Sequence, residues 1–139
     1  MESLHWINSQ ITRTQNSLYM LNLQLEDKRR ELERLALAQS NLQDRQEEFR
    51  QHTSWCTTPE LTDNTWAGHL ADQYQQWREN NLKKSYVDLY NHQLAETIEQ
   101  LNNKIREIKQ SIIDIRMDLT AQNHTLDDLY GKQRRELMN

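Results

Sequence analysis

The sequence is poor in the residues from which turns and strands are built. Its 139 residues include two glycines, one proline and one phenylalanine. Tight turns between strands depend on glycine and proline, so a sandwich or barrel with many short connections is excluded. A hydrophobic share of 35% is too low for a core of several buried layers. The abundant Gln, Glu, Leu, Arg and Asn favour long helices with solvated outer faces.

Cysteine and long apolar runs are also scarce. Cys56 is the one cysteine, so no internal disulfide is expected. No segment has the apolar length of a transmembrane helix or of a signal peptide, and we expect no direct membrane insertion. The net charge of -4, with both signs interspersed, does not suggest a nucleic-acid partner, which would require a basic patch.

Catalytic patterns are missing as well. The five histidines are scattered without the spacing of metal ligands: they are His5, His52, His69, His92 and His124. No phosphate-binding loop, nucleophile elbow or paired zinc-ligand motif occurs. Cys56 lies near two of the histidines, which we interpret as chance. We therefore predict a protein that is not an enzyme and holds no metal or cofactor.

Two apolar seams run through the rest of the chain. Between positions 4 and 49, ten of the fourteen residues at alternating spacings of three and four are apolar, and between 87 and 129 eleven of thirteen are. This spacing is that of coiled-coil helices. We predict an all-α fold in one domain, 1–139, built as a long antiparallel two-helix hairpin. Helix one would span about 2–52, the turn 53–64 and helix two about 65–137.

One register pairs the two seams. With the turn centred near Pro59, the numbers of facing residues add up to about 119, which places Ile7 against Ile112 and Ile11 against Ile108. In this register polar residues of the two seams also face one another, and Gln39 for example faces Asn80. Paired polar residues within an apolar seam are a known device for fixing the register. Helix two would then extend past helix one as a C-terminal overhang.

Two apolar stripes would remain exposed in this arrangement. Exposed apolar surface of this extent usually binds a partner, and a two-helix seam cannot bury a second face. The predicted partner-binding residues on the overhang are Leu119, Leu126, Leu129 and Tyr130. Those on the outer face of helix two are Leu82, Tyr86, Leu89 and Tyr90.

The triplet Trp66, Ala67 and Gly68 lies next to the predicted turn, at the start of the second predicted helix. Because of this position the chain resembles the WXG superfamily, the small helical hairpins of bacterial type VII secretion. Its context, "PELTDNTWAGHLADQYQQWREN", is similar to the YwqH-like, LXG-associated helical proteins. The resemblance implies a bacterial cytoplasmic protein that binds the helical N-terminal domain of an LXG toxin and supports its export. It leaves open whether this chain is exported with the toxin.

One feature departs from that resemblance. Many WXG partners carry Tyr-x-x-x-Asp/Glu near the C-terminus, whereas here Tyr130 is followed four residues later by Arg134. The tyrosine half of the export signal would then come from the partner, which is the toxin, alone or with a second small helical protein. A structural coiled-coil scaffold unrelated to secretion is the alternative function.

The triplet itself has two interpretations. Trp66 in the first turn of helix two could cap the open end of the hairpin, with its indole N–H bonded to loop carbonyls. Gly68, placed within the helix at a cost of roughly 1 kcal/mol, could let another backbone or ring approach closely. The residues fit a structural cap and a recognition surface about equally, and the resemblance favours both together.

Overall fold

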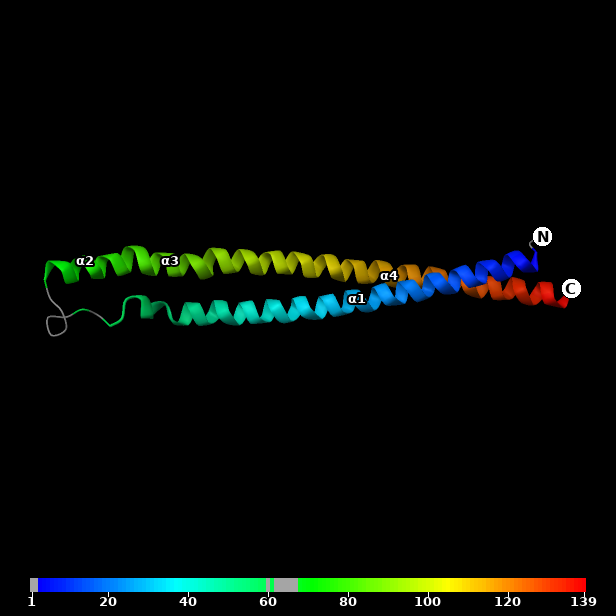
Figure 1. The fold of residues 1–139 in the computed structure, drawn as a ribbon, viewed down its shortest axis with the longest axis horizontal. Helices are drawn as coiled ribbons and strands as arrows, with labels where there is room; N and C mark the ends of the chain where they lie inside the picture. Colours follow the sequence, from blue (N-terminus) through cyan, green and yellow to red (C-terminus); the bar gives the residue numbers. More distant parts are fainter. Residues whose placement is uncertain (1–2, 60, 62–67) are drawn as a thin grey trace. The chain divides into compact units, whose positions relative to one another are not determined.

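The computed structural model describes residues 3–59, 61 and 68–139, and all of its regular elements are helical. The all-α prediction is therefore confirmed. Figure 1 shows the elements in chain order. They are α1 (Leu4–Gln51), the 3₁₀ turn η1 (Thr53–Cys56), α2 (His69–Trp77), the π turn η2 (Arg78–Leu82), α3 (Lys83–Asp88), the π turn η3 (Leu89–Gln93) and α4 (Leu94–Met138).

The ends of α1 follow from local hydrogen bonding. Ser3 precedes the helix, and its hydroxyl oxygen accepts a hydrogen bond from the Trp6 amide at 3.1 Å, which satisfies one of the unpaired N–H groups of the first turn. At the other end the Thr53 hydroxyl donates to the Arg50 carbonyl at 2.9 Å, and the chain tightens into η1. These bounds agree with the predicted 2–52 to within two residues.

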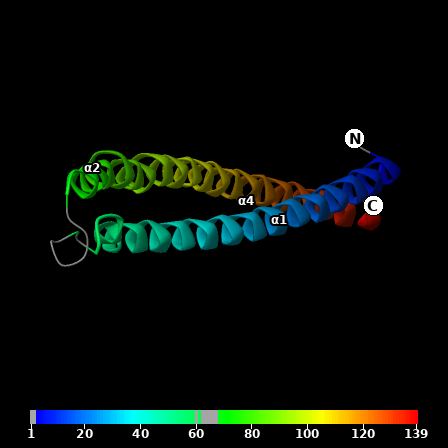
Figure 2. The same cartoon turned by 60° about the vertical axis from the view of Figure 1, so that its left-hand side comes forward.

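The chain forms two compact units, which are described separately. Unit 1 comprises residues 1–34 and 105–139, and unit 2 comprises residues 35–104. Within unit 1 the first part of α1, in blue, and the last part of α4, in red, lie side by side and antiparallel (Figures 1 and 2). Gln133 donates to Asn8 at 2.8 Å, and Gln15 donates to the Tyr130 hydroxyl at 2.9 Å.

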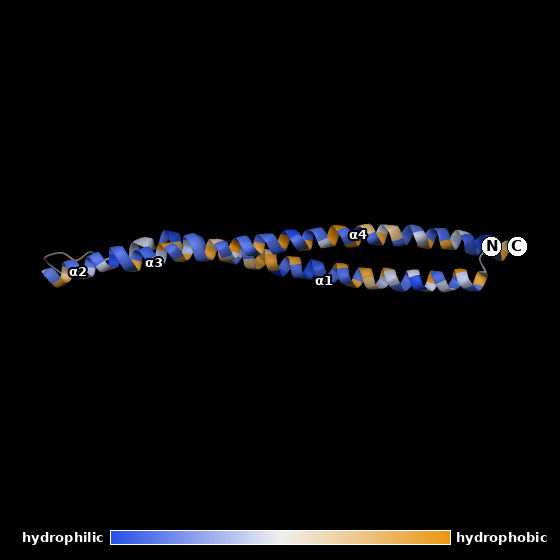
Figure 3. Ribbon diagram, turned by 90° about the horizontal axis from the view of Figure 1, so that it is seen from above, coloured by the Kyte–Doolittle hydropathy of each residue, from blue (hydrophilic) through white to orange (hydrophobic). Residues whose placement is uncertain are grey.

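The predicted seam of α1 is confirmed. Every one of its positions from Leu4 to Phe49 is buried or half-buried. Along α4 the buried residues recur at the predicted positions too: they are Ile98, Ile105, Ile108, Ile112, Ile115 and Leu129. Figure 3 shows the result as hydrophobic residues that recur along both helices between hydrophilic ones. The heptad pattern therefore identified which face of each helix is covered.

The predicted register is wrong. Ile7 and Ile11 form a core cluster with Leu129, and Leu126 and Tyr130 pack against it. No overhang therefore extends past α1 in unit 1, because the end of α4 packs beside the start of α1. The reason lies in the segment after α1, which was expected to turn back at Pro59. In unit 2 the carbonyls of Cys56 and Pro59 are instead hydrogen-bonded to Arg78 of η2. The helices are therefore offset from the predicted pairing.

The π turns of unit 2 also change which residues are covered. Leu70 and Trp77 lie at the positions that extend the predicted seam toward the start of α2, and both are exposed, whereas Ala71, Arg78 and Tyr90 are buried. A π turn closes an i→i+5 hydrogen bond and so adds about one residue to the helical repeat. The covered face therefore leaves the strict heptad wherever η2 and η3 interrupt the α-helix.

Candidate interaction surfaces

Arg78 holds the segment that follows α1 in unit 2. Its guanidinium donates from Nε to the Cys56 carbonyl at 3.1 Å and from Nη1 to the Pro59 carbonyl at 2.8 Å. A third hydrogen bond reaches the Gln75 side chain at 3.2 Å, and the Tyr74 ring lies 5.6 Å from the guanidinium carbon. These contacts fix residues 56–59 against η2.

Sequence reasoning missed Arg78 because it assigned the covered position to Trp77. The side chain is only 5% exposed, and its hydrogen bonds end on neutral oxygens, as suits a delocalised guanidinium with donors in a fixed fork. The buried positive charge of Arg78 is therefore stabilised by its hydrogen bonds to the Cys56 and Pro59 carbonyls. The sequence did contain a signal for Arg78, because this residue lies within the stretch "PELTDNTWAGHLADQYQQWREN" that carries the family resemblance.

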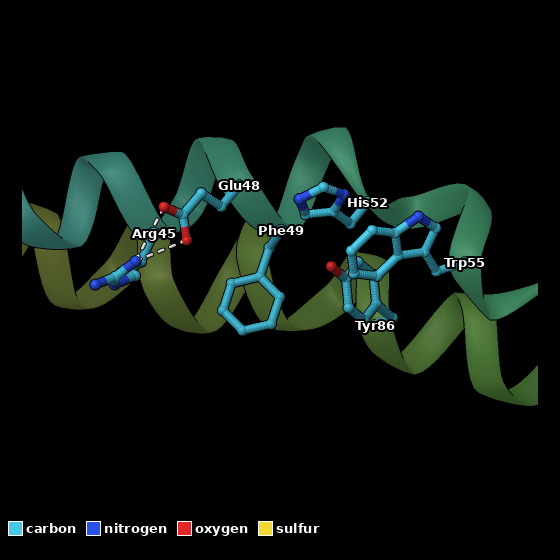
Figure 4. A pocket seen from close by; sticks show the side chains of 6 residues that line it. All are labelled: Arg45, Glu48, Phe49, His52, Trp55 and Tyr86. Carbon is cyan, nitrogen blue, oxygen red and sulfur yellow. Dashed lines mark hydrogen bonds and ion pairs between the residues drawn. The ribbon is translucent and has the colours of Figure 1, made fainter.

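An aromatic hollow of about 350 Å³ lies in the same unit, and six residues line it: they come from α1, η1 and α3, with His52 from between α1 and η1 (Figure 4). Phe49 meets the Tyr86 ring edge-on at a centroid distance of 5.3 Å. His52 stacks on Trp55 at 3.8 Å. At the rim, Arg45 donates to both carboxylate oxygens of Glu48. The hollow is shaped to receive an apolar side chain.

The phenol of Tyr86 is affected by these neighbours. Burial raises its pKa, and the nearby Cys56 and Tyr90 raise it further. Among residues 3–59, 61 and 68–139, no group of His, Cys, Asp or Glu side chains is arranged to hold a metal ion. The ring of His69, which lies near Cys56 in the sequence, is hydrogen-bonded to Gln73 at 3.0 Å. The side chains that line the aromatic hollow therefore suit contact with apolar groups.

Of the predicted motif, Trp66 and Ala67 lie outside the described residues, as does the expected start of helix two near 65. Gly68 is described, and it directly precedes α2 with φ 108° and ψ -177°. This backbone region is essentially restricted to glycine. No described atom lies within 4 Å of where a Cβ would be. The expectation that Gly68 sits within the helix is therefore wrong, and its backbone conformation itself requires glycine. Whether a partner approaches closely at Gly68 stays a prediction.

The predicted stripe on helix two does not form one exposed surface. Leu82 is exposed, Tyr86 and Leu89 are half-buried, and Tyr90 is buried. The Tyr90 hydroxyl is hydrogen-bonded to the Thr53 hydroxyl at 3.2 Å, and the Tyr90 backbone carbonyl accepts a hydrogen bond from Gln46 at 2.8 Å. Tyr90 thus packs within unit 2, and whether this stripe binds a partner stays a prediction.

The second predicted set lies in unit 1. Leu119, Leu126 and Tyr130 are half-buried and Leu129 is buried, so the exposure that motivated a binding role is largely absent. Other apolar side chains of unit 1 are exposed instead. Those more than 40% exposed include Trp6, Tyr19, Met20, Leu23, Ile113 and Met117. The outward face of unit 1 thus differs from the one that the predicted register implied.

No helix among the described residues is both long enough and apolar enough to cross a membrane.

Comparison with known proteins identifies a family for this chain. Neither a curated protein nor a solved structure matches the chain. A family model described as YwqH-like matches residues 9–130, which include all of unit 2, most of unit 1, the Arg78 clamp and Gly68. The chain therefore belongs to the YwqH-like family.

Proposed function

We propose that this protein is an accessory partner that binds the helical N-terminal domain of an LXG polymorphic toxin and supports its type VII secretion. The match to the YwqH-like family over residues 9–130 carries this proposal. The association with a toxin was inferred from a resemblance to this same family. In this proposal the chain is a WXG-type hairpin whose turn bears Trp66, Ala67 and Gly68. It works as a binding protein in the bacterial cytoplasm.

The exposed side chains support a binding role. Several large apolar residues lie on outer helix faces, where a single seam cannot cover them, and a helical partner would remove them from water. The aromatic hollow of unit 2, with Trp55 67% exposed, is a second apolar surface of this kind. Such surfaces suit association with helices rather than catalysis.

Co-expression tests this function. The chain would be produced with an LXG domain encoded beside it, purified through a tag on the LXG domain, and analysed by size-exclusion chromatography with light scattering. We expect a stable complex with a defined stoichiometry. Failure to co-purify, together with assembly of the chain into a defined homo-oligomer, would support the coiled-coil scaffold and contradict the toxin partner.

Secretion assays separate binding from export. Trp66→Ala removes the motif side chain, and loss of one aromatic side chain should cost at most a few kcal/mol of folding free energy. We expect less toxin in the culture medium while the complex still co-purifies. Gln76→Ala, at an exposed polar position of α2 in the same unit, is the control. Unchanged secretion by the Trp66 variant would show that the triplet has no role in export.

A further inference from the structure

A groove in unit 1 lies between α1 and α4 and has a volume of about 330 Å³. Its apolar floor is formed by Leu32 of α1 with Ile112 and Ile113 of α4. Three cations rim it: Arg29 from α1, and Lys109 and Arg116 from α4. We call these six residues the basic groove. The sequence did not reveal it, since Arg29 lies about 80 residues from Lys109 and the helices must pair before the cations meet.

The three cations differ from those that pair with an acid on their own helix. Several cations are paired within their own helix, as Arg30 is with Glu26, Lys28 with Glu31 and Arg45 with Glu48. Among the described residues, no hydrogen bond or ion pair joins the side chain of Arg29, Lys109 or Arg116 to an acid. The whole chain carries a net charge of -4. Three unneutralised cations on an acidic protein create a local positive field.

The apolar floor continues along α4. A second hollow, of about 510 Å³, is lined by Ile113, Arg116, Met117, Thr120, Ala121 and His124. Ile113 and Arg116 belong to both hollows, so the two are continuous. From Lys109 to His124 the surface follows about four turns of helix, roughly 23 Å at 1.5 Å per residue. Ile113 and Met117 are 48% and 66% exposed, which leaves an apolar stripe beside the cations.

We propose that the basic groove binds one amphipathic helix of the partner, whose apolar stripe packs on Leu32, Ile113 and Met117 and whose acidic flanks pair with Arg29, Lys109 and Arg116. The partner is the LXG domain, so this inference rests on the proposed function. Charge complementarity selects an acidic helix, because a basic one would meet three like charges. The apolar floor argues against nucleic acid, which is held chiefly by contacts to its phosphates.

The charges should control specificity and association rate more than total affinity. Exposed ion pairs each contribute little, whereas like charges brought together at an interface are strongly unfavourable. Replacing all three cations by acidic residues is therefore more informative than replacing them by neutral ones. Because the groove is open to water, the attraction should also weaken as salt is added.

The test measures binding of the full-length chain to the LXG domain by titration calorimetry. Arg29→Glu, Lys109→Glu and Arg116→Glu are combined in one variant. Its control combines Arg13→Glu, Arg134→Glu and Arg135→Glu, which changes the net charge equally on exposed positions of unit 1. We expect affinity to fall about 100-fold in the groove variant and by less than about 5-fold in the control. Added salt should weaken the wild type more than the groove variant.

A second variant guards against misfolding. Replacement of the three cations by glutamine adds no repulsion, and we expect the helix content to be kept and the affinity to fall about 10-fold. If the wild type binds the LXG domain and the groove variant binds as tightly as its control, the basic groove is overturned and the proposed function stands. If the wild type does not bind the LXG domain, the proposed function and the groove proposal both fail.

Discussion

The two units are held together in different ways. Unit 1 is α-helical along both of its described segments, and its centre is a seam of isoleucines and leucines. Unit 2 contains a 3₁₀ turn and two π turns, and its buried residues include Arg78 and Tyr90. Periodic apolar packing stabilises the first unit, whereas side-chain hydrogen bonds to backbone carbonyls fix the second.

This difference shows what each kind of packing specifies. An apolar seam covers a helix face wherever its period is kept, and one layer closely resembles the next. A hydrogen bond from Arg78 to the Pro59 carbonyl fits only one alignment. The Gln46 amide likewise reaches the Tyr90 carbonyl, which lies within the π turn η3. The irregular unit therefore adds contacts to backbone carbonyls that distinguish one register from another, besides the two side-chain hydrogen bonds that join the helices of unit 1.

The largest stability effect is expected in the regular unit. Ile108 is 2% exposed and one of the two most buried large side chains. Ile108→Ala should lower the free energy of unfolding by about 3 kcal/mol through lost burial and the cavity left behind. Ile113→Ala, on the same helix but 48% exposed, is the matched control and should cost less than about 1 kcal/mol. Urea unfolding followed by circular dichroism measures both.

Equal losses in the two isoleucine variants would contradict the description of unit 1. They would mean that the exposed face of α4 is covered in the free protein, for example by a second copy of the chain. Sedimentation of the Ile113 variant distinguishes that case, because such an assembly would then dissociate.

A smaller effect is expected from the clamp of unit 2. Arg78→Met keeps the length of the side chain but removes its donors to Cys56 and Pro59, which should cost about 2 kcal/mol. Lys84→Met, an exposed cation in the same unit, should change the free energy of unfolding by less than about 0.5 kcal/mol. Hydrogen exchange should be faster around η1 in the Arg78 variant and unchanged in unit 1. Uniformly faster exchange would argue against a local clamp.

The heptad pattern predicted the covered faces but not the pairing. Ile11 was expected against Ile108 and instead clusters with Leu129, about 21 residues or three heptads further along. A seam that repeats every seven residues matches itself after any whole number of heptads, so the apolar pattern alone does not set that number. The polar residues misled for the same reason, since Gln39 has Asn102 rather than Asn80 as its hydrogen-bond partner.

The candidate surfaces were harder to predict than the fold. The stripe at Leu129 and Tyr130 was inferred from an overhang, and so it depended on the number of heptads. The basic groove requires Arg29 and Lys109 to come from paired helices, which no local pattern encodes. Gly68 was singled out as part of the motif, but its place in the backbone depends on a φ angle that the residue type does not reveal.

The smallest effects compare the two glycines of the chain, one in each unit. Gly68 has φ 108°, where an L-residue is strained, so Gly68→Ala should destabilise the protein by about 1 kcal/mol after the adjoining backbone relaxes. Gly131 lies within α4, and no described atom would clash with an added Cβ. Gly131→Ala should therefore stabilise by up to about 1 kcal/mol through helix propensity. Thermal unfolding of the two variants should thus shift in opposite directions from the wild type. If Gly68→Ala raised the unfolding temperature as well, Gly68 would not need its positive φ and the strain argument would be contradicted.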